Sequence, residues 1–198
     1  MWAAGLSLLV FLGLTVVARG GPTEVDRAIY DAVHPLDAGP LGDYEDTVVQ
    51  IFDAPIWTAL VLLAGAVLWS RRRRGLAVLL AIGVTVEAAT LAAKLMFGLF
   101  APGLLSGYPS GHVARVAVTG GMVLLWLVLG HRPRIEIVIA GIVVACAVLV
   151  VGTMRVMSGV HRPIDVAGAI LLALGWVLAI AALVLRRDIP LLPLEPGS

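Results

Sequence analysis

The sequence predicts an all-α membrane protein that crosses the bilayer several times. We expect six transmembrane helices in a bundle and a short interfacial helix in the first outer loop. Composition is the first reason: 60% of the 198 residues are apolar, 14% are charged, and the mean hydropathy is +1.02. A soluble domain has about a quarter charged residues, so this chain has too few charges to cover a surface in water. Length is the second reason, because a membrane helix needs about 20 apolar residues and several segments approach that number.

The expected spans are long apolar runs separated by short polar connections. They are residues 2–18, 54–70, 75–97, 111–130, 135–153 and 165–185. The first run lacks the basic flank and the cleavage site of a secretory signal, so we expect it to remain as a helix. We expect residues 1–187 to form a single domain and residues 188–198 to form a cytoplasmic tail.

Charged residues are distributed unequally between the two sets of connections. Arginines cluster at Arg71–Arg74, at residues 131–134 and at Arg186–Arg187, which share one side of a six-helix arrangement. Segment 19–53, on the other side, contains eight acidic residues and two arginines. The positive-inside rule therefore predicts a multi-pass protein of a bacterial inner membrane, with both termini in the cytoplasm. Apolar residues four apart within 22–34 predict the amphipathic interfacial helix in the acidic segment.

The first unusual polar set lies before the fourth span, on the outer side. Lys94 lies near the end of the third span, and Pro109-Ser110-Gly111-His112 comes directly before a new apolar run. Proline, serine and glycine in this position are typical of a helix start. The free backbone N–H groups of a helix start bind anions, Gly111 allows close approach, and Ser110 adds a hydroxyl donor. His112 lies in the first turn, where it can exchange a proton with a bound group.

The second polar set lies in the connection between the last two spans. Arg155, His161 and Asp165 occur there, and Pro163 indicates that the last helix begins close to Asp165. An arginine fork suits phosphate oxygens. A carboxylate that orients one imidazole nitrogen makes the other nitrogen a better nucleophile. The set therefore favours chemistry on a phosphate group.

Each of these residues has an ordinary explanation when it is considered alone. A lone lysine at a helix end is more often a snorkelling anchor, and a lone interfacial histidine is more often structural. Phosphate chemistry is favoured because both sets share the outer side and together supply two cations, two histidines, a carboxylate and a helix start. The chain shows no dense carboxylate or thiol cluster, so we expect no metal and no cofactor. The one cysteine, Cys146, is expected to be a small buried residue.

These motifs resemble the type 2 phosphatidic acid phosphatase family, which shares its site with vanadium haloperoxidases and bacterial acid phosphatases. The family's Pro-Ser-Gly-His motif is complete at residues 109–112. Its third motif matches at Arg155, His161 and Asp165, although Met154 replaces the leading serine. Its first motif matches at Lys94 and at residue 102, but alanine replaces arginine at 101. The motifs cover about the C-terminal half, and the six-span layout extends the resemblance to most of the chain.

The resemblance implies a role for each matching position. His161 would attack phosphorus and form a phosphohistidine, and Asp165 would orient His161. His112 would protonate the leaving lipid oxygen and then activate water. The implied phosphate ligands are Lys94, Ser110, Gly111 and Arg155. We also predict Arg115 as a ligand that partly replaces the arginine missing at 101, with the alternative that Arg115 pairs with Glu87 inside the membrane.

The sequence thus predicts a metal-independent lipid phosphatase with its site on the outer face. Isoprenyl diphosphates, phosphatidylglycerol phosphate and phosphatidic acid are the candidate substrates, and the bilayer itself is the other expected partner. One alternative is a phospholipid-phosphate binding protein with impaired chemistry, which the alanine at 101 motivates. Another is a transporter, but no symmetry between the two halves supports it. The net charge of +1 gives no indication of a nucleic-acid partner, and the oligomeric state stays open.

Overall fold

The structure is a computed structural model that describes residues 2–100 and 107–186. Every regular element in these two ranges is a helix, as the predicted all-α class requires. The helices are α1 (Trp2–Arg19), α2 (Glu24–Val33), the 3-10 helix η1 (His34–Ala38), α3 (Pro40–Ile51), α4 (Ala54–Ser70), α5 (Arg74–Gly83), α6 (Val86–Phe100), α7 (Gly111–Leu129), α8 (Arg134–Met157) and α9 (Pro163–Arg186). The alanine and proline at 101 and 102 and the predicted tail at 188–198 lie outside the described residues.

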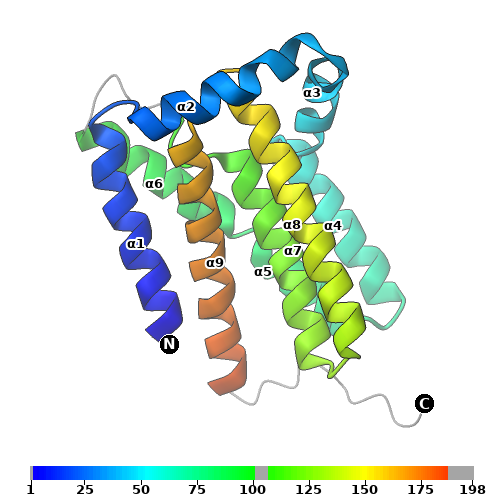
Figure 1. Cartoon of the computed structure of the whole chain (residues 1–198). Helices are drawn as coiled ribbons and strands as arrows, with labels where there is room; N and C mark the ends of the chain where they lie inside the picture. Colours follow the sequence, from blue (N-terminus) through cyan, green and yellow to red (C-terminus); the bar gives the residue numbers. More distant parts are fainter. Residues whose placement is uncertain (1, 101–106, 187–198) are drawn as a thin grey trace.

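The long helices run side by side in a bundle that is organised around α7 (Figure 1). Helix α7 contacts α5, α6, α8 and α9, and α1 packs along α9. Val118 and Met122 of α7 are fully buried in one apolar core with Leu79 of α5 and Ala173 of α9. The outer faces of the helices are also apolar, which is expected when lipid replaces water around a bundle. Cys146 on α8 is exposed, so the expectation that it would be buried is wrong.

Within the described residues, five helical segments are long and apolar enough to cross a membrane: α1, Arg74–Met96, α7, α8 and α9. Helix α4 has 17 residues and becomes a sixth candidate span together with α3, from which it is bent by 61°. The expected span 75–97 corresponds to the segment Arg74–Met96, in which a short irregularity at residues 84–85 separates α5 from α6. There the Thr85 hydroxyl donates to the carbonyl of Ile82 and accepts a hydrogen bond from the Trp176 indole at 3.2 Å. Such local side-chain bonds compete with the helical backbone pattern.

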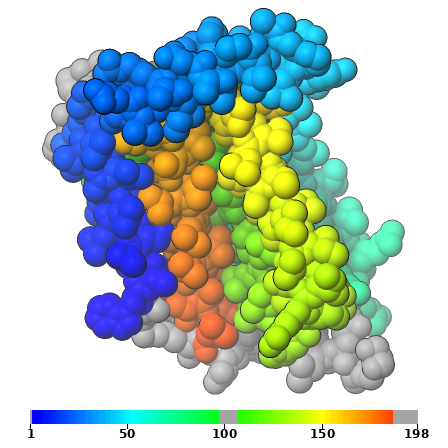
Figure 2. All heavy atoms as spheres, viewed as in Figure 1, coloured from blue at the N-terminus to red at the C-terminus, as the bar shows by residue number. Residues whose placement is uncertain are grey.

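Helices α2, η1 and α3 lie across one end of the bundle (Figure 1), and their side chains cover the adjoining ends of α8 and α9 (Figure 2). Helix α2 begins with a capping box, in which Thr23 Oγ1 accepts the Asp26 N–H at 3.0 Å and an Asp26 carboxylate oxygen accepts the Thr23 N–H at 2.9 Å. The other Asp26 oxygen accepts the N–H of Ile164 at 3.0 Å. The predicted short helix at 22–34 is therefore present and is attached to the start of α9.

The basic connections lie at the opposite end of the bundle from α2. The α4–α5 turn, the α7–α8 turn and the end of α9 all meet this end in Figure 1. These are the segments that contain Arg71–Arg74, residues 131–134 and Arg186. The fold thus separates the acidic segment from the basic connections, as a six-helix arrangement predicts.

Candidate functional site

The two predicted polar sets meet at the end of the bundle that α2 and α3 cover. The segment before α7 and the connection between α8 and α9 are joined there by a backbone hydrogen bond from Ser110 N–H to the Asp165 carbonyl at 3.1 Å. Both Ser110 and Asp165 are almost fully buried. The tertiary structure therefore brings together two motifs that are about 50 residues apart in the sequence.

His161 and Asp165 form a buried pair at the start of α9. Asp165 Oδ2 lies 3.8 Å from His161 Nδ1, which is ion-pair distance rather than a hydrogen bond. Arg162 fixes the carboxylate, because its N–H donates to Oδ2 at 2.9 Å and its Nη2 donates to Oδ1 at 3.2 Å. Gly107 packs directly against Asp165, and a Cβ at position 107 would lie 2.5 Å from Oδ2. The close packing leaves Asp165 little freedom and points it at one face of His161.

Buried polar atoms without a partner are concentrated in this site. Within the described residues, five side-chain nitrogen or oxygen atoms are buried and make no hydrogen bond. Three of the five belong to predicted site residues, namely Ser110 Oγ, Arg155 Nε and His161 Nδ1. Ser110 is also the N-cap residue of α7, yet its side chain makes no capping bond. Because buried polar groups are almost always paired, a cluster of unpaired ones is typical of a site that binds a polar ligand.

The two predicted cations lie within electrostatic reach of the same centre. The charged groups near enough to act on Lys94 are Arg115 and Glu87 first, and then Asp165 and Arg155. Arg155 Nη1 donates to Glu45 Oε1 of α3 at 2.8 Å, and the side chains retain only 12% and 9% exposure. The acidic outer segment therefore enters the site and holds one edge of the Arg155 guanidinium. Its Nε edge is the part that has no partner.

His112 lies in the first turn of α7 and is bonded to a carboxylate that sequence reasoning did not select. Its Nε2 lies 2.9 Å from Asp53 Oδ1, at the junction between α3 and α4. The His112 side chain is 15% exposed and that of Asp53 is 48% exposed. The second imidazole of the site therefore has its own carboxylate partner, supplied from 59 residues earlier in the chain.

Arg115 is held by Glu87, which is the alternative that the sequence left open. Its Nε and Nη2 donate to the two Glu87 oxygens at 2.5 and 2.9 Å, and its Nη1 donates to the Phe52 carbonyl at 2.7 Å. Arg115 lies against Gly111, since a Cβ at position 111 would be 3.3 Å from Nη2. The guanidinium is thus close to the predicted phosphate site but is bonded on three of its atoms to protein groups.

Tyr108 anchors the segment that precedes α7. Its ring is 2% exposed and stacks on Phe11 of α1 with centroids 5.5 Å apart, and its hydroxyl donates to the Phe11 carbonyl at 3.0 Å. Burial raises the pKa of the Tyr108 phenol to about 12, so the hydroxyl stays a donor. Gly168 of α9 provides the room, because a Cβ there would lie 2.5 Å from the ring. Anchoring of Tyr108 holds the segment in which Ser110 lies two residues later.

Sequence reasoning missed Asp53, Glu45 and Gly107 as parts of the site. The first two are individual members of an acidic run, and no spacing rule separates them from their neighbours. Arg162 is different, because its adjacency to His161 already indicates from the sequence that it lies near the site. Gly107 had no signal beyond being one residue before Tyr108.

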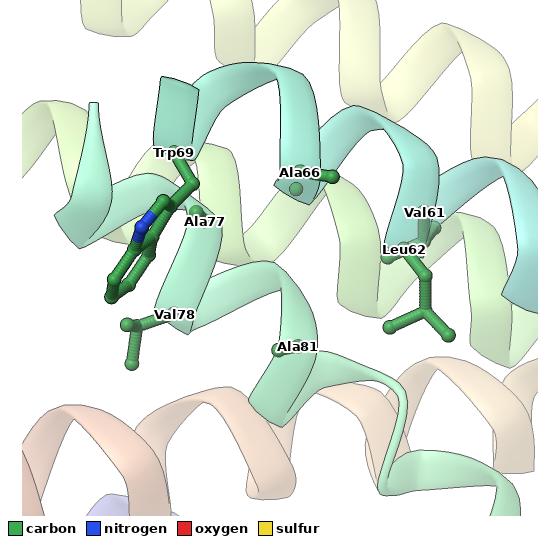
Figure 3. A pocket seen from close by; sticks show the side chains of 8 residues that line it. Val61, Leu62, Ala66, Trp69, Ala77, Val78 and Ala81 are labelled. Carbon is green, nitrogen blue, oxygen red and sulfur yellow. The ribbon is translucent and has the colours of Figure 1, made fainter. Parts of the chain in front are cut away.

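Two cavities in the described structure differ in the polarity of the side chains that line them. A cleft of about 250 Å³ between α4 and α5 is lined only by apolar and aromatic side chains, among them Trp69 and Val78 (Figure 3). It has no titratable lining group. A second cavity of about 230 Å³ lies between α2 and the α8–α9 connection, and His161, Arg162 and Arg27 line it. The second cavity reaches the paired histidine and is therefore the one associated with the site.

No group of three or more histidine, cysteine, aspartate or glutamate side chains is arranged to hold a metal in the part of the chain that the structure describes. The groups that converge instead are two imidazoles with carboxylate partners, an arginine, a lysine and a helix start. Fold and site together define a multi-pass helical membrane protein with a buried site suited to an anion.

The comparisons with known proteins agree with that class. Residues 99–189 match the model of the PAP2 superfamily, and the predicted resemblance to the type 2 phosphatidic acid phosphatases is thereby confirmed. The structure is similar to the crystal structure of a transmembrane PAP2 type phosphatidylglycerolphosphate phosphatase from Bacillus subtilis. The TM-score is 0.75 at 21% identity, over 94% of this chain and 98% of that chain, so the likeness establishes the fold. No curated protein matches the chain significantly. Together, the family match and the fold support a helical membrane protein with a PAP2-type region at residues 99–189.

Proposed function

We propose that the chain hydrolyses a phosphate group from a membrane lipid through a phosphohistidine, without a metal. The observation that carries the proposal is that two buried donors, Ser110 Oγ and Arg155 Nε, have no partner and occur together with the buried pair of His161 and Asp165. Ser110 is the N-cap residue of α7, where free N–H groups and the helix dipole favour an anion, and its backbone N–H binds the Asp165 carbonyl of the second polar set. A phosphate would satisfy the serine and arginine donors and would present phosphorus to the histidine.

His161 is the proposed nucleophile. Its Nδ1 faces Asp165, which leaves Nε2 to attack phosphorus. The bond from phosphorus to the leaving oxygen breaks, and His112 gives a proton to that oxygen. His112 then takes a proton from water as the water oxygen attacks phosphorus, and the phosphorus–nitrogen bond breaks to release inorganic phosphate.

The proposed phosphate ligands are the groups that carry or orient positive charge around this centre. They are Lys94, Ser110, the Gly111 N–H and Arg155, and they stabilise the charge on the transferred phosphoryl group. We no longer assign a phosphate contact to Arg115, because Glu87 and the Phe52 carbonyl engage its guanidinium. The proposed substrate classes remain isoprenyl diphosphate, phosphatidylglycerol phosphate and phosphatidic acid, bound from the outer leaflet of a bacterial inner membrane by a single domain over 1–187.

The test uses the purified protein in detergent with EDTA and a panel of these lipid phosphates. We expect phosphate release by the wild type and none by His161→Ala. A matched control is His131→Asn at the basic end of the bundle, where the left-handed backbone (φ 50°) tolerates asparagine. This control should keep full activity. Binding of the lipids without release would establish the impaired binding protein instead, and release that survives His161→Ala would overturn the histidine mechanism.

A further inference from the structure

The junction between α3 and α4 delivers a carboxylate to the second histidine of the site. We propose that Asp53 is a positioning residue that orients His112 for proton transfer, so that the site contains two histidine–carboxylate pairs. This inference rests on the proposed function, because it assigns a partner to the proposed general acid. It does not concern the nucleophile pair of His161 and Asp165.

The contact itself has the geometry of an orienting hydrogen bond. Asp53 Oδ1 lies 2.9 Å from His112 Nε2. A carboxylate on one imidazole nitrogen fixes the ring orientation and directs the other nitrogen, here Nδ1, away from it. His112 is in the first turn of α7, directly after Ser110 and Gly111. The freed nitrogen is thus the one available to a leaving group that is bound at the helix start.

The local structure of Asp53 also indicates a role outside its own helix. Asp53 is the N-cap residue of α4, where an aspartate normally accepts an N–H of the first turn and contributes about 1 kcal/mol. Its side chain makes no such bond. The carboxylate bonds to His112 instead, and Pro55 at the second position of α4 already removes one of the N–H groups that would need a cap.

Phe52, which precedes Asp53, shows how the junction between α3 and α4 is held in place. The Phe52 carbonyl accepts a hydrogen bond from Arg115 Nη1 at 2.7 Å, and Glu87 holds the same guanidinium through both oxygens. Arg115 lies three residues after His112 on α7, so one helix contacts Phe52 and Asp53 through adjacent turns. The 61° bend between α3 and α4 places these two residues at the corner. Arg115 and Glu87 therefore fix the backbone from which Asp53 reaches His112.

The functional consequence is specific to steps in which His112 moves a proton. Orientation of the ring matters most when the leaving oxygen needs a proton, as an alkyl oxygen does. It matters little when a nitrophenolate leaves, because that anion is stable without protonation. Loss of Asp53 should therefore slow release of the alkyl leaving group much more than release of nitrophenolate. A general loss of folding or of phosphate binding would slow the release of both leaving groups alike.

The experiment compares Asp53→Asn with the wild type on a lipid alkyl phosphate and on p-nitrophenyl phosphate. We expect kcat for the alkyl substrate to fall by about 10- to 100-fold with KM changed less than about threefold, since general acid–base catalysis contributes 10²- to 10⁴-fold. With p-nitrophenyl phosphate, rapid mixing should show a nitrophenolate burst of about one equivalent at the wild-type rate, followed by slow turnover. The slow phase reflects water activation by the same histidine.

Asp46→Asn is the matched control, because Asp46 is an exposed acid on α3, and it should behave as the wild type. Equal thermal unfolding temperatures would show that both variants fold. The inference is overturned if Asp53→Asn keeps wild-type kcat on the alkyl substrate, if its nitrophenolate burst slows by the same factor as its alkyl turnover, or if kcat on the alkyl substrate rises. Wild-type activity together with an inactive His161→Ala keeps the proposed function intact in each of these cases. An inactive wild type would instead refute the proposed function.

Discussion

Substitution of Gly107 by alanine tests how closely the nucleophile pair is packed. A Cβ at position 107 would lie 2.5 Å from Asp165 Oδ2, whereas ordinary contacts begin at 3.4 Å. The carboxylate oxygen must therefore move by 3.4 − 2.5 = 0.9 Å. The same oxygen accepts the Arg162 N–H at 2.9 Å and is the atom that faces His161. Movement of this oxygen disturbs both contacts at once.

A misplacement of about 1 Å in a catalytic group costs roughly 10²-fold in rate. We therefore expect Gly107→Ala to lower kcat by about 100-fold while KM changes little, because the phosphate ligands are on other residues. The assay is phosphate release from a lipid phosphate in detergent. Gly141→Ala is the control, since a Cβ at Gly141 meets nothing within 4 Å. A kcat for Gly107→Ala within about twofold of the control would refute the packing argument.

Three further predictions concern stability and substrate binding. Gly168→Ala places a Cβ 2.5 Å from the Tyr108 ring, and we expect the free energy of unfolding, measured by thermal unfolding, to fall by about 1–3 kcal/mol. Unchanged stability would show that the ring moves freely. Glu87→Ala leaves the mostly buried Arg115 guanidinium without its carboxylate, so the free energy of unfolding should fall by about 3 kcal/mol. The prediction is contradicted if the loss of unfolding free energy is smaller than the loss of activation free energy calculated from kcat. Glu45→Gln removes the negatively charged carboxylate that pairs with Arg155. We therefore expect KM for an anionic lipid to fall roughly fivefold, or about 1 kcal/mol. A raised KM would mean that Glu45 mainly orients Arg155.

Much of the fold follows from local sequence. Long apolar runs predict helices at a membrane because unpaired backbone groups cannot be left in lipid, and helices α1, α4, α7, α8 and α9 occur where those runs lie. The short interfacial helix was predictable from its start at Thr23 and its amphipathic spacing. The interruption between α5 and α6 was not predicted, and Thr85 there accepts a hydrogen bond from Trp176 of α9, a long-range contact that no local pattern indicates.

The site divides in the same way between sequence and tertiary structure. The residues that approach one another through short spacings, such as His161 and Asp165, could be paired from the sequence because one helical turn separates them. Partners from distant segments could not, and Asp53 and Glu45 are indistinguishable from other acids of segment 19–53 until the chain folds over the end of α7. The sequence by itself determined a multi-pass helical protein and the residue types of the proposed phosphate site. Only the tertiary structure decided that Arg115 pairs with Glu87 and that His112 receives a carboxylate, since long-range contacts depend on how helices pack rather than on any local pattern.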